Sequence, residues 1–221
     1  MNAKCAAILV DPHPCCHIVY PYTDENLGSQ AVCLFASSGI RQGEGVILIM
    51  ARSHCNPINR LLEAEGFNVS SLQKAGKLTS IVADDLLSCI MVDGVLDENL
   101  FKATIGAIIN RARASTSNGH QSKVRIFGEM VSLLWNANLA ATTRLEELWN
   151  GVIDIYDVSI LCTYALRGTA HDTLPESLIA LHSHCTIESS HCCRARQRKT
   201  NIRGCALACS MNSWTLAWHG S

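Results

Sequence analysis

The feature that most constrains this fold is a run of five consecutive apolar residues at positions 46–50 (VILIM), followed by a helical pattern. Apolar side chains without polar alternation are typical of a strand buried on both faces, as in a parallel sheet. Four further β-prone segments alternate with helical patterns along the chain, at residues 17–22, 77–83, 123–127 and 158–162. Since parallel strands need crossover connections, the sequence predicts an α/β fold with a mostly parallel sheet covered on both faces.

Capping residues, proline and glycine predict where the intervening helices begin and end. Aspartate is a preferred residue at helix N-termini, where its side chain accepts a backbone hydrogen bond. Asp24 and Asp97 each precede a helical apolar pattern, so we expect both to cap helices. Pro57 is tolerated in the first turn of a helix, so we expect a helix to begin there. Gly151 is expected to end a helix that begins at residue 139.

Composition divides the chain into two parts. Residues 1–188 contain all 19 acidic residues and 13 of the 18 basic ones, whereas residues 189–221 contain no acid and four of the twelve cysteines. The last part also lacks an apolar period of either 3.6 or 2 residues. We therefore expect a poorly ordered, basic, cysteine-rich tail over 189–221. The part before it is expected to form one domain over 15–188, preceded by an N-terminal lead over 1–14.

Charge and hydropathy exclude several classes of function. The formal net charge is −1 and only 17% of residues are charged, which argues against direct binding to nucleic acid. No apolar run approaches the ~18 residues of a membrane span, and the apolar segment 5–10 is too short for the core of a signal peptide. We expect a cytoplasmic protein whose cysteines, such as Cys33 and Cys89, act as small apolar side chains.

The sequence lacks the signals of a phosphate-binding loop. Such loops follow a strand and are rich in glycine, with a lysine for the phosphates. After residues 17–22 the chain reads TDENLG, and its G-x-G motif at 43–45 precedes a strand instead of following one. We expect no nucleotide and no other cofactor.

Ligands of parallel α/β folds bind beyond the carboxyl ends of the strands, and polar residues follow several predicted strands here. They are Tyr20, Tyr22, Arg52, Ser53, His54, Asp84, Asp85, Glu129, Thr163, Tyr164 and Arg167. Glu129 directly follows a buried strand, where a carboxylate needs a charged partner. We expect Arg125 or Arg144 to pair with it, on the border of a pocket.

Metal ligation is only weakly indicated. His182, His184 and Cys185 are residue types that bind zinc, but they lie beside the change in composition and their spacing matches no standard zinc module. The segment Cys15-Cys16-His17 is equally weak. We expect no metal site.

Longer strings of residues resemble one family in their order along the chain. They are HIVYPYTDENL, GIRQGEGVILIMARSHCNPINRLLEAEGFNV, GKLTSIVADDLL, MVDGVLDENLF, VRIFGEMVSLLW, RLEELWN and VSILCTYAL. Together they resemble the MEDS domain, a sensory module of methanogen and methylotroph regulators, over about residues 15–185. The positions that fit the family pattern are His17, Gly39, Gly43, Glu44, His54, Gly66, Gly128, Glu129, Met130, Trp135, Leu145, Glu146, Trp149, Cys162 and Tyr164.

This resemblance implies a three-layer, RecA-like fold without the phosphate-binding loop of its ATPase relatives. It also implies a cytoplasmic signal-input domain of the kind that precedes histidine kinases or belongs to transcription regulators. Such domains are proposed to sense small organic compounds, including hydrocarbon derivatives. The resemblance supplies no catalytic residues, and the tail has no counterpart in it.

We therefore interpret the chain as a non-enzymatic sensory domain that binds a small organic ligand, a signalling partner, or both. The candidate ligand-binding residues are Tyr20, Tyr22, His54, Glu129, Trp135, Cys162 and Tyr164. Two alternatives remain open at this point. One is a residual nucleotide hydrolase with Glu129 as its base, and the other is an interaction module whose pocket is filled by side chains. The sequence does not determine the oligomeric state.

Overall fold

The structure is a computed structural model that describes residues 1, 3–116, 122–135, 137–166 and 173–186. Within these residues, six strands form one parallel sheet in the order β3-β2-β6-β7-β1-β8. The strands are β1 (His17–Tyr22), β2 (Gly45–Met50), β3 (Leu78–Val82), β6 (Val124–Gly128), β7 (Ser159–Ala165) and β8 (His184–Cys185). The predicted α/β class and parallel sheet are confirmed.

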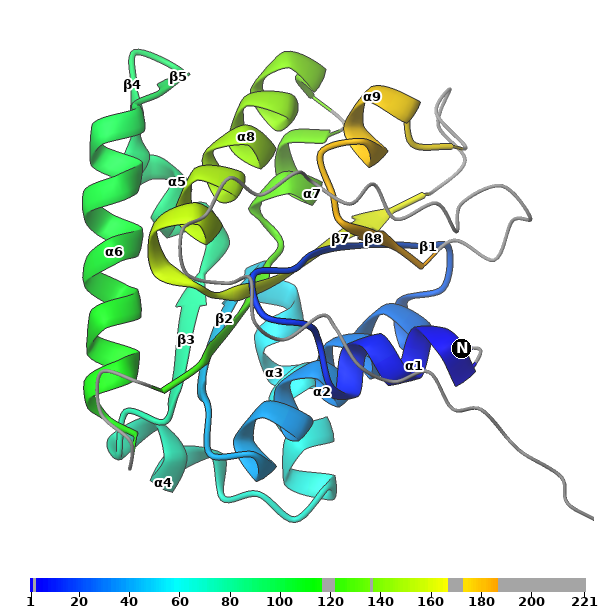
Figure 1. Ribbon diagram of the computed structural model, residues 1–221, viewed down its shortest axis with the longest axis vertical. Coiled ribbons are helices and arrows are strands. Elements are labelled where there is room, and N and C mark those ends of the chain that lie inside the picture. Colours follow the sequence, from blue (N-terminus) through cyan, green and yellow to red (C-terminus); the bar gives the residue numbers. More distant parts are fainter. Residues whose placement is uncertain (2, 117–121, 136, 167–172, 187–221) are drawn as a thin grey trace, which may run out of the picture.

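Helices cover both faces of this sheet and complete three layers (Figure 1). One face carries α1 (Ala3–Val10), α2 (Glu25–Arg41), α3 (Arg52–Ala64) and α4 (Val69–Lys74). The other carries α5 (Ala83–Ile90), α6 (Glu98–Ala114), α7 (Met130–Trp135), α8 (Leu139–Tyr156) and α9 (Glu176–Ile179).

Successive strand residues point to opposite faces. In β2, for example, Leu48 packs under the α2 layer while Ile47 and Ile49 pack under the α6 layer. The run at 46–50 is therefore apolar throughout because both of its faces are buried.

A small hairpin connects α5 to α6. Its strands are β4 (Met91–Val92) and β5 (Val95–Leu96), and they pair antiparallel. The two turn residues between them, Asp93 and Gly94, have φ values of 51° and 78°. Two consecutive residues with positive φ are typical of the tight hairpin turn for which Asp-Gly is a preferred sequence.

Two helix boundaries differ from the prediction. The third helix begins at Arg52, directly after β2, and Pro57 lies inside it. Pro57 removes one hydrogen bond near the exposed start of the helix, and the buried face around Ile58 and Leu62 compensates for that loss. Gly151 does not end α8, because Val152 and Ile153 continue the buried face; the helix ends where Asp157 adopts φ 50°.

The N-terminal lead is part of the packed unit. Residues 3–10 form α1, which packs on α2, and Leu9 is fully buried there. The expected tail over 189–221 lies outside the described residues.

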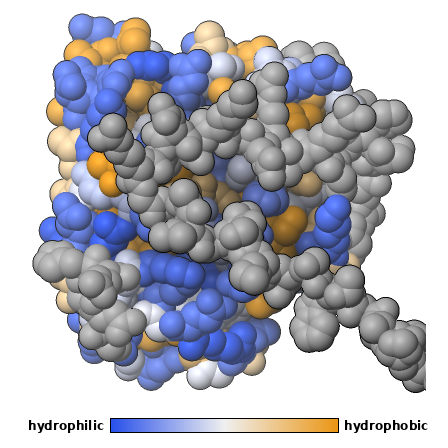
Figure 2. Space-filling model, in the orientation of Figure 1, coloured by the Kyte–Doolittle hydropathy of each residue, from blue (hydrophilic) through white to orange (hydrophobic). Residues whose placement is uncertain are grey.

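Figure 2 shows mostly hydrophilic residues on the lower part of one face, where α3 and α4 lie. Among the described helices, none has the length and apolar character to cross a bilayer.

Candidate functional site

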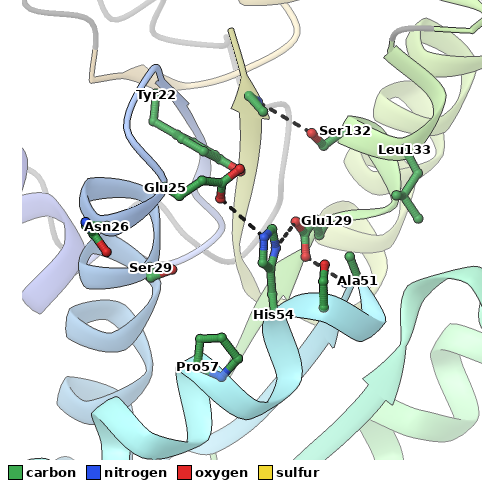
Figure 3. Close-up of a pocket in the computed structure, with 12 residues that line it drawn as sticks. Tyr22, Glu25, Asn26, Ser29, Ala51, His54, Pro57, Glu129, Ser132 and Leu133 are labelled. Atoms are coloured by element: carbon green, nitrogen blue, oxygen red, sulfur yellow. Dashed lines mark hydrogen bonds and ion pairs between the residues drawn. The ribbon is translucent and has the colours of Figure 1, made fainter. Parts of the chain in front are cut away.

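A cleft of about 600 Å³ opens at the carboxyl ends of four strands, β1, β2, β6 and β7 (Figure 3). Its walls are formed by residues at or just beyond the ends of these strands and by the first two turns of α2, α3 and α7. The lining residues are Tyr22, Glu25, Asn26, Ser29, Ala51, Ser53, His54, Pro57, Glu129, Ser132, Leu133 and Ala165. The cleft thus lies at the edge where parallel α/β folds bind ligands.

Glu129 is the central polar side chain of this cleft. It follows β6 directly and is only 3% exposed. Its Oε1 atom lies 2.5 Å from Nδ1 of His54, and its Oε2 atom accepts a hydrogen bond of 2.6 Å from the backbone N–H of Ala51. Both donors belong to the junction between β2 and α3. A buried carboxylate is stable only with such partners, so Glu129 ties the end of β6 to the start of α3.

His54 stands between two carboxylates. Its Nε2 atom lies 3.2 Å from Oε2 of Glu25 in α2, while its Nδ1 atom faces Glu129 (Figure 3). The hydrogen bond to Glu129 raises the pKa of His54 above its ordinary value, against the effect of burial. A protonated imidazole has one N–H for each carboxylate. His54 therefore connects three segments of the chain: α2, the start of α3 and the end of β6.

The cleft has an acidic character. None of its described lining residues is lysine or arginine, whereas Glu25 and Glu129 both face it. The N-terminus of α2, which elsewhere would suit an anion, already has a side-chain acceptor, because Asp24 accepts a hydrogen bond from the N–H of Asn26. These charges disfavour phosphate and carboxylate ligands and favour uncharged or cationic ones.

Tyr22 supplies an apolar wall of the cleft, and a glycine makes room for it. A Cβ atom added at Gly28 would lie 3.0 Å from carbon atoms of the Tyr22 ring. The absence of that atom lets the ring lie against α2, at the side of the cleft. Pro57 and Leu133 add apolar surface, so the cleft combines apolar walls with a few polar groups, as ligand sites usually do.

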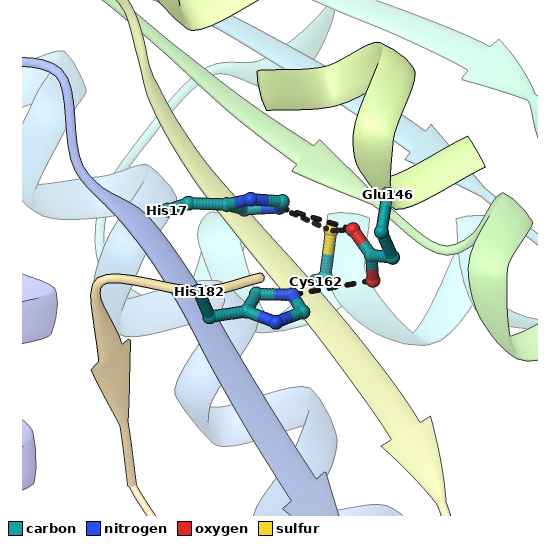
Figure 4. Close-up of side chains that lie close together, drawn as sticks. All are labelled: His17, Glu146, Cys162 and His182. Atoms are coloured by element: carbon teal, nitrogen blue, oxygen red, sulfur yellow. Dashed lines mark hydrogen bonds and ion pairs between the residues drawn. The ribbon is translucent and has the colours of Figure 1, made fainter. Parts of the chain in front are cut away.

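A second group of chemically active side chains is buried on the α8 side of the sheet (Figure 4). His17 of β1, Glu146 of α8, Cys162 of β7 and His182, between α9 and β8, offer ligand atoms that all lie within 4.8 Å of one another. All four residues are buried. Burial lowers the pKa of His17, and the neighbouring His182 lowers it further. Burial raises the pKa of Cys162, and the neighbouring Glu146 raises it further.

Comparison with known proteins decides the family. The model of the family described as "MEthanogen/methylotroph, DcmR Sensory domain" matches residues 16–183, a range that contains both the cleft and the buried group. The chain belongs to the MEDS family. The resemblance noted from the sequence is thereby confirmed, and a sensory role follows in general terms.

The fold of this MEDS domain is similar to that of a KaiC-like protein from the hyperthermophilic archaeon Pyrococcus horikoshii OT3. The TM-score is 0.52 at 11% sequence identity, over 78% of this chain and 71% of that chain. At this identity the likeness concerns the fold alone, and it confirms the RecA-like three-layer architecture. No curated protein matches the chain significantly.

The structure separates the seven predicted ligand-binding residues into two groups. Tyr22, His54 and Glu129 line the cleft of the MEDS domain. The other four are buried in the core and do not line it: Tyr20, Trp135, Cys162 and Tyr164. Strand alternation explains the difference for β7, because Cys162 and Tyr164 point towards α8 and donate hydrogen bonds to Glu146. The ring of Trp135 packs edge-on against Tyr164, with 5.7 Å between the centroids.

The prediction that an arginine pairs with Glu129 is wrong. Arg125 points to the opposite face of the sheet, where it forms a buried ion pair with Glu44. Arg144 lies on the exposed side of α8 and pairs with Glu98 and Glu147. The partner of Glu129 is His54, which the sequence analysis placed on the same edge without pairing the two.

The three weak metal candidates also separate. His182 lies in the buried group, with its ring centroid 4.1 Å from that of His17. His184 and Cys185 form β8 and are not in that group.

Sequence reasoning gave Glu146 no role beyond the family pattern, although a carboxylate between Leu145 and Leu148 on an apolar helical face was a usable signal. Glu25, which contacts His54, had no signal beyond its place after the helix cap.

Proposed function

We propose that this MEDS domain senses a small, uncharged or cationic organic ligand that binds in the cleft between Tyr22, His54 and Glu129. The observation that carries the proposal is the position of His54. It connects α2, the start of α3 and the end of β6 across the cleft. A molecule that enters the cleft meets these three segments together.

The mechanism is a shift between two arrangements of the cleft. The contact of His54 with Glu25 is partly exposed, with side-chain exposures of 24% and 38%. A cationic or hydrogen-bonding ligand competes for Glu25, and α2 then moves relative to α3. A ligand shifts such an equilibrium only by the difference between its affinities for the two states. The moved helix surface is what a signalling partner, such as a histidine kinase or a transcription regulator, would recognise.

Binding without turnover is part of the proposal. Both oxygens of Glu129 accept hydrogen bonds, one from His54 and one from Ala51, and these bonds tie the carboxylate to the junction of β2 and α3, which supports a positioning role over that of a general base. The acidic cleft also disfavours the phosphates of a nucleotide. These features support a sensor over a residual nucleotide hydrolase, and the open volume of the cleft supports it over a module whose pocket is filled.

The test is calorimetric titration of the full chain with trimethylammonium, methanol and Mg-ATP as cationic, neutral and anionic probes. We expect heat of binding from the cationic or the neutral probe and none from Mg-ATP. Ser29→Phe places a large side chain in the cleft from α2, so it should weaken that binding at least tenfold, a change of about 1.4 kcal/mol.

The matched control is Gln30→Phe, which adds the same side chain to the neighbouring, exposed position of α2. It should bind the probe like the unmodified protein. If Mg-ATP binds instead of the organic probes, the hydrolase alternative replaces the proposal. If Ser29→Phe and Gln30→Phe affect binding equally, the cleft is not the ligand site.

A further inference from the structure

Four separations within the buried group on the α8 side are close to those of a tetrahedral metal site. Nε2 of His17 lies 3.1 Å from Oε2 of Glu146 and 3.3 Å from Sγ of Cys162, and that sulfur lies 3.4 Å from the same oxygen. Nε2 of His182 lies 3.2 Å from Oε1 of Glu146. Metal–ligand distances of 2.0–2.3 Å in a tetrahedron give ligand–ligand separations of about 3.3–3.7 Å.

Hydrogen bonds fix which nitrogen of each imidazole carries a proton. Nδ1 of His182 lies 3.0 Å from the backbone oxygen of Leu178, which can only accept, so Nδ1 carries the proton. Nδ1 of His17 lies 3.1 Å from Oδ1 of Asn150, and the amide nitrogen of Asn150 donates to the backbone oxygen of Leu181. This second bond fixes the orientation of the amide, so Nδ1 of His17 is a donor as well.

In a neutral imidazole the remaining nitrogen, Nε2, then has a lone pair and no proton. Both Nε2 atoms point at the carboxylate of Glu146 (Figure 4). Nε2 of His182 is buried and lies 3.2 Å from Oε1 of Glu146, but it forms no hydrogen bond of good geometry with any described residue. Lone pairs that face a carboxylate repel it unless a proton or a metal ion lies between them, and a single proton would serve only one of these two nitrogens. Two adjacent imidazolium ions would satisfy the carboxylate, but their rings are only 4.1 Å apart in a fully buried site.

We propose that His17, Glu146, Cys162 and His182 bind one zinc ion. Two imidazole nitrogens, one carboxylate oxygen and one thiolate sulfur are ligand types of zinc, and four protein ligands complete its tetrahedral shell. The bonds from Nδ1 to Leu178 and Asn150 are the outer hydrogen bonds that commonly orient metal-binding histidines. Tyr164 donates to Oε1 of Glu146 and leaves Oε2 facing His17 and Cys162.

The site is closed, since all four ligands are buried, so the ion has a structural role. It joins β1, β7 and α8 to the segment between α9 and β8. That segment leads into β8, the last described strand, which pairs with β1 over two residues at the edge of the sheet. Zinc therefore stabilises the edge of the sheet beside the strands that end at the cleft. This inference does not depend on what the cleft binds.

Metal content of the full chain tests the proposal. The protein is purified from cells grown in zinc-supplemented medium and dialysed, and its zinc content per chain is measured by inductively coupled plasma mass spectrometry. We expect Cys162→Ser and His182→Gln each to lose one zinc ion per chain. The matched control is Cys33→Ser, which removes a buried thiol in α2 on the opposite face of the sheet, and it should keep the metal content of the unmodified protein.

X-ray absorption at the zinc edge gives a second measurement that needs no variant. It should show one sulfur and three nitrogen or oxygen neighbours for the ion at this site. Three results would overturn the proposal: a metal-free protein, equal zinc contents in Cys162→Ser and Cys33→Ser, or a zinc shell dominated by sulfur, which would place the ion on other cysteines. If Cys162→Ser fails to fold, the absorption spectrum of the unmodified protein decides.

Discussion

Nδ1 of His54 lies 2.5 Å from Oε1 of Glu129, and this contact joins the first turn of α3 to the residue that follows β6. The two residues are 75 positions apart in the sequence. Because β2 and β6 are neighbours in a parallel sheet, their carboxyl ends meet at one edge, and the pair follows from that topology. The contact also places two ionisable side chains on the wall of the cleft. Substitutions at these two residues therefore test both the fold and the electrostatics of the cleft.

Replacing Glu129 with glutamine should leave the fold intact and lower the pKa of His54. The amide cannot accept at both of its ends, so either the N–H of Ala51 or that of His54 loses its acceptor. A buried donor without an acceptor costs about 1–3 kcal/mol. We expect the free energy of unfolding to fall by that amount in urea titrations. The His54 ring resonances should titrate at lower pH in NMR spectra, and an unchanged titration would contradict the assigned pairing.

Stability should depend on pH through His54 in a defined direction. The hydrogen bond to Glu129 raises the pKa of His54 above its ordinary value of 6.5. The folded state therefore holds the proton more tightly than the unfolded state does. The resulting stabilisation is complete below pH 6.5 and is lost as the pH rises through the raised pKa of the folded state.

The measurement is urea unfolding of the unmodified protein and of His54→Gln at a series of pH values between about 5 and 9. The difference in unfolding free energy between the two proteins should be largest at the acidic end and should shrink towards the alkaline end. A difference that grows with pH would mean that His54 is neutral in the folded state.

The order of strands and helices was predictable because it rests on local patterns. The run at 46–50 is apolar at every position, and a strand covered on both faces places all five side chains in the core. The edge of the sheet that holds the cleft followed from the parallel topology. The boundaries at Pro57 and Gly151 were not predictable, since in each case the buried face beyond the residue outweighed its local preference.

Side-chain partners were harder to predict than elements, and Arg125 shows why. It precedes Glu129 by four positions, and the sequence offered it and Arg144 equally as partners of that carboxylate. In the sheet, Arg125 faces the α2 layer and Glu129 leaves the strand at its end. The buried group at His17 was missed for a related reason: its four members come from elements that lie far apart in the sequence, and only the packing of α8 and α9 on β1 and β7 brings them together.

The ion pair of Arg125 with Glu44 should contribute strongly to stability. Arg125 is 1% exposed and Glu44 is 8% exposed, and Nη1 of Arg125 also donates to the backbone oxygen of Leu9. Removing one partner of a buried pair leaves an unpaired buried charge, at a cost of about 3–5 kcal/mol. We expect that loss in Glu44→Ala. The exposed pair of Arg41 with Glu65 is the control, and Arg41→Ala should change stability by about 1 kcal/mol or less.

The first helix provides the last prediction. Leu9 is fully buried where α1 packs on α2, whereas the adjacent Val10 is 38% exposed. Truncating a buried leucine to alanine removes transfer free energy and leaves a cavity, which together cost about 2–5 kcal/mol. Leu9→Ala should therefore lower the free energy of unfolding by that amount, and Val10→Ala should change it by about 0.5 kcal/mol or less. Equal, small effects in both variants would mean that α1 does not pack on α2 in solution.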